Sequence, residues 1–115
     1  MNKDVNNQNS VLLKEIIKRL KPLKPDKIIL FGSYAYGKPN KNSDIDLYIV
    51  TNDDFMPQNW REKSCIYRKF VDRLDDLQTT IPIDLIVHTK KMYDKFIEMD
   101  SMFSRKIINN GKVLL

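Results

Sequence analysis

The stretch that decides the fold runs from Lys27 to Val50: it begins with KIILFGS (residues 27–33) and ends with SDIDLYIV (residues 43–50). Both ends are short apolar runs rich in β-branched residues, which is typical of buried strands. A third run of this kind, IDLIVH, occupies residues 83–88. The first two runs are only about a dozen residues apart, so we expect them to pair as antiparallel neighbours.

Two of these apolar runs carry acidic residues. Asp44 and Asp46 are two positions apart, so on a strand their side chains point to the same face. Asp84 is the second residue of the third run. A carboxylate on such a segment is costly unless something neutralises it. If the strands are neighbours, the three carboxylates converge and form an oxygen-rich site suited to Mg²⁺ and substrate phosphates.

The glycine and serine after the first strand complete this pattern. Gly32 and Ser33 follow Phe31 directly, where a tight turn can offer backbone N–H groups to a phosphate. A phosphate-binding turn next to three carboxylates predicts nucleotidyl transfer. A P-loop is disfavoured, because GSYAYGKP (residues 32–39) is one residue short and has Pro39 where that motif needs Ser or Thr.

The segments LFGSYAYG (residues 30–37) and SDIDL (residues 43–47) resemble the glycine-serine and paired-aspartate pattern of the DNA polymerase beta superfamily of nucleotidyltransferases. The closest resemblance is to its small branch, the minimal nucleotidyltransferases. It covers most of the chain, from about Val11 to the C-terminus. The resemblance implies an α/β (α+β) fold, in which helices pack on a mixed β-sheet like the palm of DNA polymerase beta.

The resemblance also implies roles for individual residues. Asp44 and Asp46 would hold two Mg²⁺ ions, and Asp84 would hold the ion nearest the acceptor and take the acceptor's proton. Gly32 and Ser33 would bind the phosphates of the nucleotide substrate, ATP. Many family members have an arginine where this chain has Tyr36. Two lysines are therefore candidates for the missing phosphate contact, namely Lys38 and Lys41.

The acceptor is expected to be a partner protein. The chain leaves no room for the acceptor-binding domain of larger relatives, so a second protein or a second copy must supply that surface. In the minimal branch, the resemblance implies an antitoxin that transfers AMP from ATP to a small helical HEPN-type RNase toxin. The alternative is a non-catalytic antitoxin with a degenerate site, which Tyr36 keeps open. Small-molecule nucleotidylation is disfavoured by the missing domain.

Composition sets the broad class. The chain has 115 residues, a formal net charge of +5 and a single cysteine, Cys65. It therefore cannot form an intramolecular disulfide, and we expect a reducing compartment, the cytoplasm. No apolar run approaches the roughly 20 residues of a membrane span. Basic residues are not interleaved with aromatic ones, so nucleic-acid binding is disfavoured. Homo- or hetero-oligomers both fit these properties.

The remaining segments predict helices around the strands. Residues 1–10 are polar and expected to be disordered, and residues 11–115 are expected to form one domain. Apolar spacing predicts helices at residues 11–20 (with Ser10 as N-cap), 60–77, 91–99 and 102–110, and a short edge strand at 113–115.

Several other residues are expected to have structural rather than catalytic roles. We expect Trp60 to be a packing anchor, or an interface residue if exposed. Cys65 is expected to be at least partly buried, and His88 to end its strand without a role. Five side chains are expected in the core, with contact to a partner as the alternative: Met92, Phe96, Met99, Met102 and Phe103.

Overall fold

A computed structural model describes residues 3–35 and 44–115, with side chains described from Val11 onward. The helices are α1 (Lys3–Leu20), α2 (Trp60–Val71), α3 (Lys90–Met99) and α4 (Met102–Asn110). The strands are β1 (Lys27–Phe31), β2 (Ile45–Val50), β3 (Ile83–His88) and β4 (Lys112–Val113). Three short 3₁₀ turns connect them, at Lys21–Leu23, Asp72–Leu74 and Leu77–Thr79.

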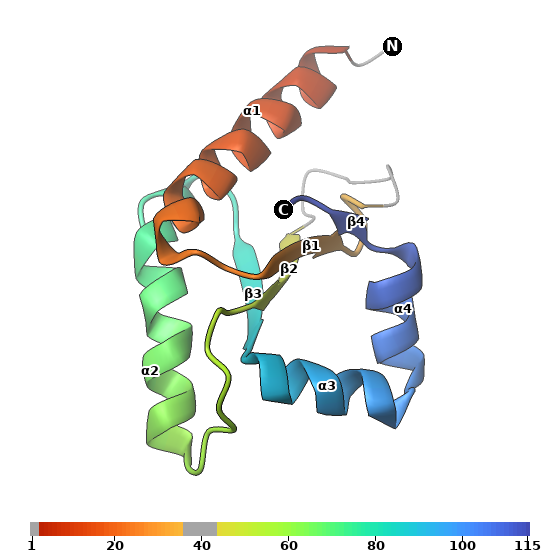
Figure 1. The fold of residues 1–115 in the computed structure, drawn as a ribbon. Coiled ribbons are helices and arrows are strands. Elements are labelled where there is room, and N and C mark those ends of the chain that lie inside the picture. The colour runs from red at the N-terminus through yellow and green to blue at the C-terminus, as the bar shows by residue number, and fades with distance from the viewer. Residues whose placement is uncertain (1–2, 36–43) are drawn as a thin grey trace.

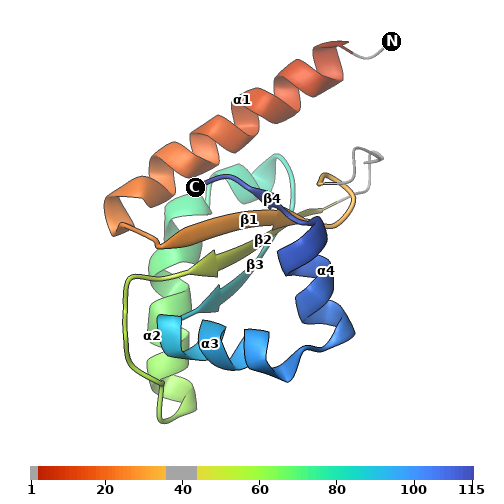
Figure 2. The same cartoon turned by 45° about the vertical axis from the view of Figure 1, so that its right-hand side comes forward.

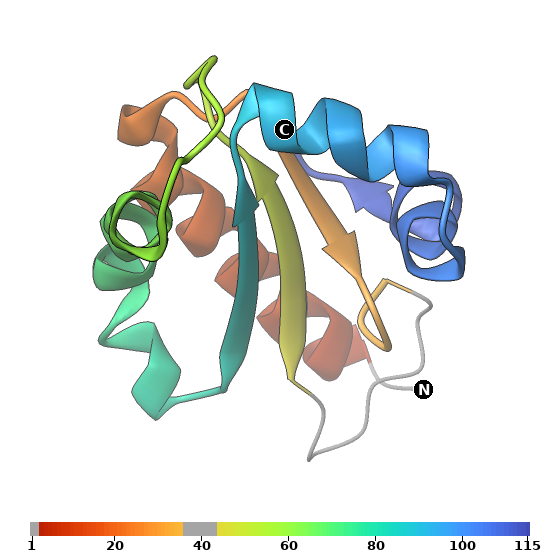
Figure 3. The ribbon, with the colours of Figure 1, turned by 90° about the horizontal axis from the view of Figure 1, so that it is seen from below.

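The strands form one mixed sheet in the order β3-β2-β1-β4 (Figure 3). β1 pairs antiparallel with β2 and with β4, whereas β2 and β3 are parallel. The antiparallel β1–β2 pair and the mixed sheet confirm two predictions from the sequence. The parallel β2–β3 pair matters for function, because it places the starts of both strands at the same end of the sheet.

Helices cover both faces of the sheet (Figures 1 and 2). On one face, Ile16 and Leu20 of α1 and Ile66 and Phe70 of α2 pack against the strands. On the other face, α3 and α4 cover a smaller core around Tyr48. Burial from both sides explains why β1 and β2 are nearly continuous apolar runs rather than alternating ones. In the part of the chain described, no helix is both long and apolar enough to span a membrane.

The helices differ from their predicted bounds at two places. α1 begins at Lys3, so residues 3–10 are helical although their polarity predicted disorder, and Ser10 lies inside the helix rather than at its N-cap. Each residue added to an existing helix gains a hydrogen bond, so a nucleated helix extends into polar sequence. α2 ends at Val71 rather than residue 77, and 3₁₀ turns continue the chain. An α-helix and a 3₁₀-helix both bring residues that are three apart onto one side. The apolar spacing therefore could not show where α2 ends and the 3₁₀ turns begin.

Several predicted core positions are exposed. The side chain of Trp60 is 79% exposed, so its interpretation as a packing anchor was wrong. Cys65 is also exposed, because α2 buries Ile66 and Phe70 instead. Met99 and Met102 are 71% and 87% exposed at the α3–α4 corner. Apolar character alone did not reveal which side of each helix faces the sheet.

Candidate active site

Three carboxylates gather at one end of the sheet. Asp46 on β2 lies directly opposite Asp84 on β3 in the parallel register. Neighbouring residues in register point to the same face, and here it is the face that α3 and α4 cover. Asp44 immediately precedes β2. We call Asp44, Asp46 and Asp84 the acidic cluster.

The electrostatics indicate that the members of the acidic cluster are close. Partial burial raises the pKa of Asp46, and the nearby charges of Asp84 and Asp44 raise it further. Desolvation likewise raises the pKa of Asp84, and its charge repulsion and hydrogen-bonding contact with Asp44 add to the effect. Like charges disfavour one another's ionisation. Repulsion between these carboxylates would be relieved by a cation bound among them.

Gly32 makes room for one of these carboxylates. It follows β1 with a φ of +78°, a backbone conformation that residues with a Cβ rarely adopt. A Cβ built at this position would lie 2.3 Å from Oδ2 of Asp46. Only glycine lets the turn after β1 approach the Asp46 carboxylate this closely. The structure thus brings the predicted glycine turn and the acidic cluster together.

The residues after Gly32 form a tight turn. The N–H group of Ala35 donates to the carbonyl oxygen of Gly32 at 3.0 Å, which closes the turn around Ser33. Ser33 is half-buried there. Lys38 and Lys41, and also Tyr36, lie outside the described residues, so their predicted roles stay predictions.

Tyr34 is a neighbour of the site that the sequence analysis did not single out. Burial raises the pKa of its phenol, and the charge of Asp44 raises it further. Its ring also packs against the larger core. The signal in the sequence was its position directly after Ser33. Tyr34 therefore joins the glycine turn to both the core and the acidic cluster.

The donor chemistry of the cluster fits Mg²⁺. Carboxylate oxygens are the ligands that this ion prefers, and few protein ligands suffice because substrate phosphates supply others. Among the described side chains, no group of three acidic, histidine or cysteine residues is already arranged to hold a metal ion. Repelling carboxylates have no reason to adopt such an arrangement without a cation between them. The side chains would need to reorient around the ion.

His88 does not belong to the acidic cluster. It ends β3, four residues beyond Asp84, which corresponds to about 13 Å along a strand. Its Nδ1 atom lies 2.7 Å from the hydroxyl oxygen of Tyr48, and its ring contacts Phe96 edge-on. Burial lowers the pKa of His88 to about 4. The ring is therefore neutral near pH 7 and packs against Tyr48 and Phe96, whereas we expected His88 to end its strand without a role.

The comparisons with known proteins concern both sequence and fold. Residues 12–112 match the family model described as nucleotidyltransferase domain. A Methanocaldococcus jannaschii protein named "Putative protein adenylyltransferase" is 34% identical over 94 residues, which are 76% of each chain. A toxin-antitoxin crystal structure with AMP-PNP matches with a TM-score of 0.54 at 21% identity, over 90% of this chain and 72% of that one. A mutant MntA-HpeT toxin-antitoxin structure matches with a TM-score of 0.51 at 19% identity, over 90% and 71%.

Proposed function

Because this chain belongs to the nucleotidyltransferase domain family, we propose that it transfers AMP from ATP to a hydroxyl group of a partner protein. One observation carries the proposal. Asp46 and Asp84 lie opposite each other on parallel strands, and the positive-φ turn at Gly32 leaves space for the Asp46 carboxylate. This arrangement places the turn that we propose to bind phosphates next to the acidic cluster that we propose to bind Mg²⁺.

Asp44, Asp46 and Asp84 are the residues that would hold Mg²⁺. Bound there, the metal would lower the pKa of the attacking hydroxyl and neutralise charge on the triphosphate. The N–H groups of the turn at Gly32 and Ser33 would orient the phosphates away from the acceptor. This orientation matters because positioning supplies much of the rate enhancement in phosphoryl-type transfer.

Asp84 has the second role of accepting a proton. The acceptor oxygen attacks the α-phosphorus of ATP, the α–β phosphoanhydride bond breaks, and pyrophosphate leaves with the bonding electrons. The proton of the acceptor hydroxyl passes to the Asp84 carboxylate. Asp84 is suited to this role by its place in the sheet, because β2 separates it from β1 and the glycine turn that would hold the triphosphate.

We further propose that the partner is a HEPN-type toxin and that this chain is its antitoxin. Two findings support this step. The relative from M. jannaschii is named as a protein adenylyltransferase. The fold of the described residues is similar to that of chains in toxin-antitoxin structures, one of them with AMP-PNP. A protein that docks beside the acidic cluster would present its hydroxyl already oriented.

The test is to incubate the purified chain with ATP, Mg²⁺ and the protein encoded by the adjacent gene, and to measure both intact masses. We expect AMP to be added to the neighbour. The Asp84→Asn variant should lose the activity, whereas Asp94→Asn, an exposed carboxylate on α3, should retain it. Tight binding that neutralises the neighbour with no mass change would instead indicate the non-catalytic antitoxin.

A further inference from the structure

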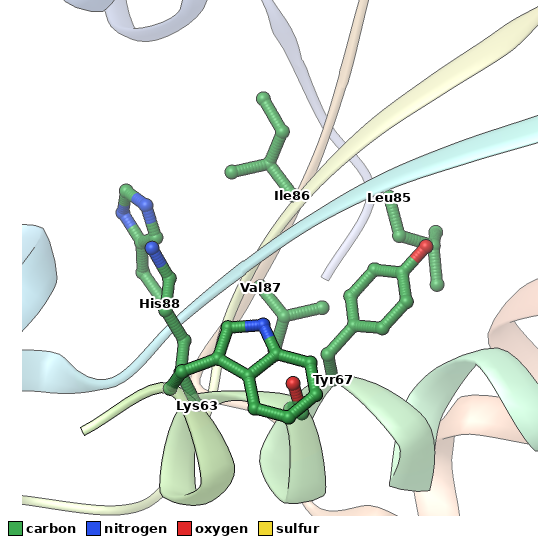
Figure 4. Close-up of a pocket in the computed structure, with 8 residues that line it drawn as sticks. Lys63, Tyr67, Leu85, Ile86, Val87 and His88 are labelled. Carbon is green, nitrogen blue, oxygen red and sulfur yellow. The ribbon is translucent and has the colours of Figure 1, made fainter. Parts of the chain in front are cut away.

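A groove runs between the outer edge of the sheet and α2. β3 is the last strand of the sheet on this side, with β2 as its neighbour. The groove encloses about 370 Å³ and is lined by residues 85–88 of β3 and by one side of α2. Figure 4 shows the side chains of Lys63 and Tyr67 from α2 together with those of Leu85, Val87 and His88. This volume is at the lower end of ligand pockets.

The floor of the groove is a free strand edge. The carbonyl oxygens of Pro82 and His88 accept hydrogen bonds from β2 or the residue after it. Backbone groups alternate along a strand, so Asp84 and Ile86 also face β2. Ile83, Leu85 and Val87 must then direct their N–H and C=O groups outward, away from the sheet.

The outward backbone groups of Ile83 already have hydrogen-bond partners, whereas those of Leu85 and Val87 do not within the described residues. The side-chain amide of Gln78 accepts from the N–H group of Ile83 at 2.9 Å and donates to its carbonyl oxygen at 2.8 Å. Gln78 thus occupies the place of a neighbouring strand at this residue. For Leu85 and Val87, no outward backbone partner exists within residues 3–35 and 44–115. Leu85 and Val87 are 8% and 7% exposed, and the two N–H and two C=O groups that they direct outward are without a backbone partner in this part of the chain.

The wall of the groove is apolar, aromatic and basic. Four residues of α2 line it at helical spacing: Trp60, Lys63, Ser64 and Tyr67. The side chains of Trp60 and Tyr67 are 79% and 41% exposed. Large aromatic side chains beside unpaired backbone groups are typical of sites for extended peptides.

We propose that this groove binds an extended, acidic segment of a partner protein, which adds to the sheet as a strand beside β3. Backbone hydrogen bonds to Leu85 and Val87 would hold the segment, and alternate side chains would pack on Trp60 and Tyr67. Lys63 gives the groove its charge, and no carboxylate of the described residues lines it. A second copy of this chain carries the same formal net charge of +5, so charge complementarity favours an acidic partner segment over a second copy.

This proposal does not depend on the proposed function. It needs only the outward backbone groups of β3 and the side chains of α2, whereas the side chain of Asp84, the residue before Leu85, points to the face of the sheet that α3 and α4 cover. Where both hold, the bound segment and the acidic cluster share β3, so docking would bring the partner near the metal-binding carboxylates.

The experiment titrates the ¹⁵N-labelled chain with the blocked peptide Glu-Glu-Val-Tyr-Val-Glu-Glu, without nucleotide or metal, and follows amide hydrogen exchange. We expect exchange at Leu85 and Val87 to slow at least tenfold on binding, because their N–H groups gain acceptors. The amides of Asp84 and Ile86 already face β2 and should not change. The matched basic peptide Lys-Lys-Val-Tyr-Val-Lys-Lys should bind at least tenfold more weakly.

A charge reversal tests the role of Lys63. Lys63→Glu should weaken binding of the acidic peptide about fivefold to tenfold, since it replaces an exposed attraction with a repulsion. Lys69→Glu is the matched control, an exposed lysine of α2 outside the groove, and should bind as the wild type does. The proposal is overturned if exchange at Leu85 and Val87 is unchanged at millimolar peptide. It is also overturned if a higher protein concentration, without peptide, slows hydrogen exchange at both amides. That result would mean that a second copy of the chain occupies the groove.

Discussion

Replacing Gly32 with alanine should lower the free energy of unfolding, and part of that loss should depend on the Asp46 carboxylate. The methyl group would lie 2.3 Å from Oδ2 of Asp46, and the backbone would keep a φ of +78°. The left-handed conformation costs a residue with a Cβ about 1–2 kcal/mol. Displacing the carboxylate adds roughly 1 kcal/mol, at the low end for an overpacked site, because a side chain can move.

We therefore expect Gly32→Ala to lower the free energy of unfolding by about 2–3 kcal/mol. In an Asp46→Ala background the carboxylate is absent, and only the backbone strain of about 1–2 kcal/mol should remain. The double-mutant cycle should thus give a coupling energy of about 1 kcal/mol between the two positions. The measurement is urea unfolding followed by circular dichroism, since the exposed Trp60 is a poor fluorescence reporter.

Gly111→Ala provides the control for this cycle. A Cβ at Gly111 would also be crowded, at 2.3 Å from the carbonyl oxygen of Ile107 and 2.5 Å from Cγ2 of Ile29. Neither contact involves the acidic cluster, so its cost should be the same with and without Asp46→Ala. If Gly32→Ala also costs the same in both backgrounds, the turn does not press on Asp46 and the reasoning is refuted.

Three further outcomes follow from the structure. Asp44→Asn and Asp46→Asn should abolish AMP transfer while the melting temperature stays equal or rises, because like-charge repulsion is relieved; unfolding of either variant would make that carboxylate structural. ATP with Mg²⁺ at 100 times the dissociation constant should stabilise the fold by about 2.7 kcal/mol in thermal unfolding, and EDTA should remove this gain. Stability should fall as the pH drops from 6.5 to about 4, because the unfolded chain protonates His88 in this window while the folded imidazole stays neutral. Partial solvent contact reduces this loss to roughly 1–2 kcal/mol, and His88→Gln should remove it from a denaturant titration at each pH.

The strands were the most predictable part of the fold. β1 and β2 are buried on both faces over most of their length, and β3 is buried at every second residue, so local sequence identifies all three as strands. The short connection between the first two runs predicted their antiparallel pairing correctly. Convergence of Asp84 with the other two aspartates was predicted only on the condition that the strands are neighbours, and the register that sets Asp84 opposite Asp46 came from the structure.

For the helices, the local sequence pattern predicted the bounds of α3 and α4 but not which side chains are buried. Apolar spacing predicted α3 and α4 to within one residue of their bounds. It did not predict the exposure of Trp60 or Met102, because the side of a helix that faces the sheet depends on tertiary packing. The groove beside β3 was equally hidden, since nothing in a strand's own residues says that it lies at the edge of the sheet.

The site was predictable in its residue types and less so in its contacts. Glycine followed by serine, and three aspartates on apolar runs, were visible as a pattern. The contact between Gly32 and the Asp46 carboxylate required the positive φ of the turn, which the sequence only permits. The position of Tyr34 beside Asp44 is likewise a result of how the turn packs on the core.

One labelling experiment tests the proposed reaction most directly. The chain and the protein encoded by its adjacent gene are incubated with Mg²⁺ and with ATP labelled either at the α-phosphate or at the γ-phosphate. Nucleotidyl transfer predicts that the α-label becomes covalently attached to the neighbour and that the γ-label is released in pyrophosphate, with both signals lost in Asp46→Asn. Attachment of the γ-label would mean phosphoryl transfer, and attachment of neither label would mean inhibition by binding alone; either result would contradict the account.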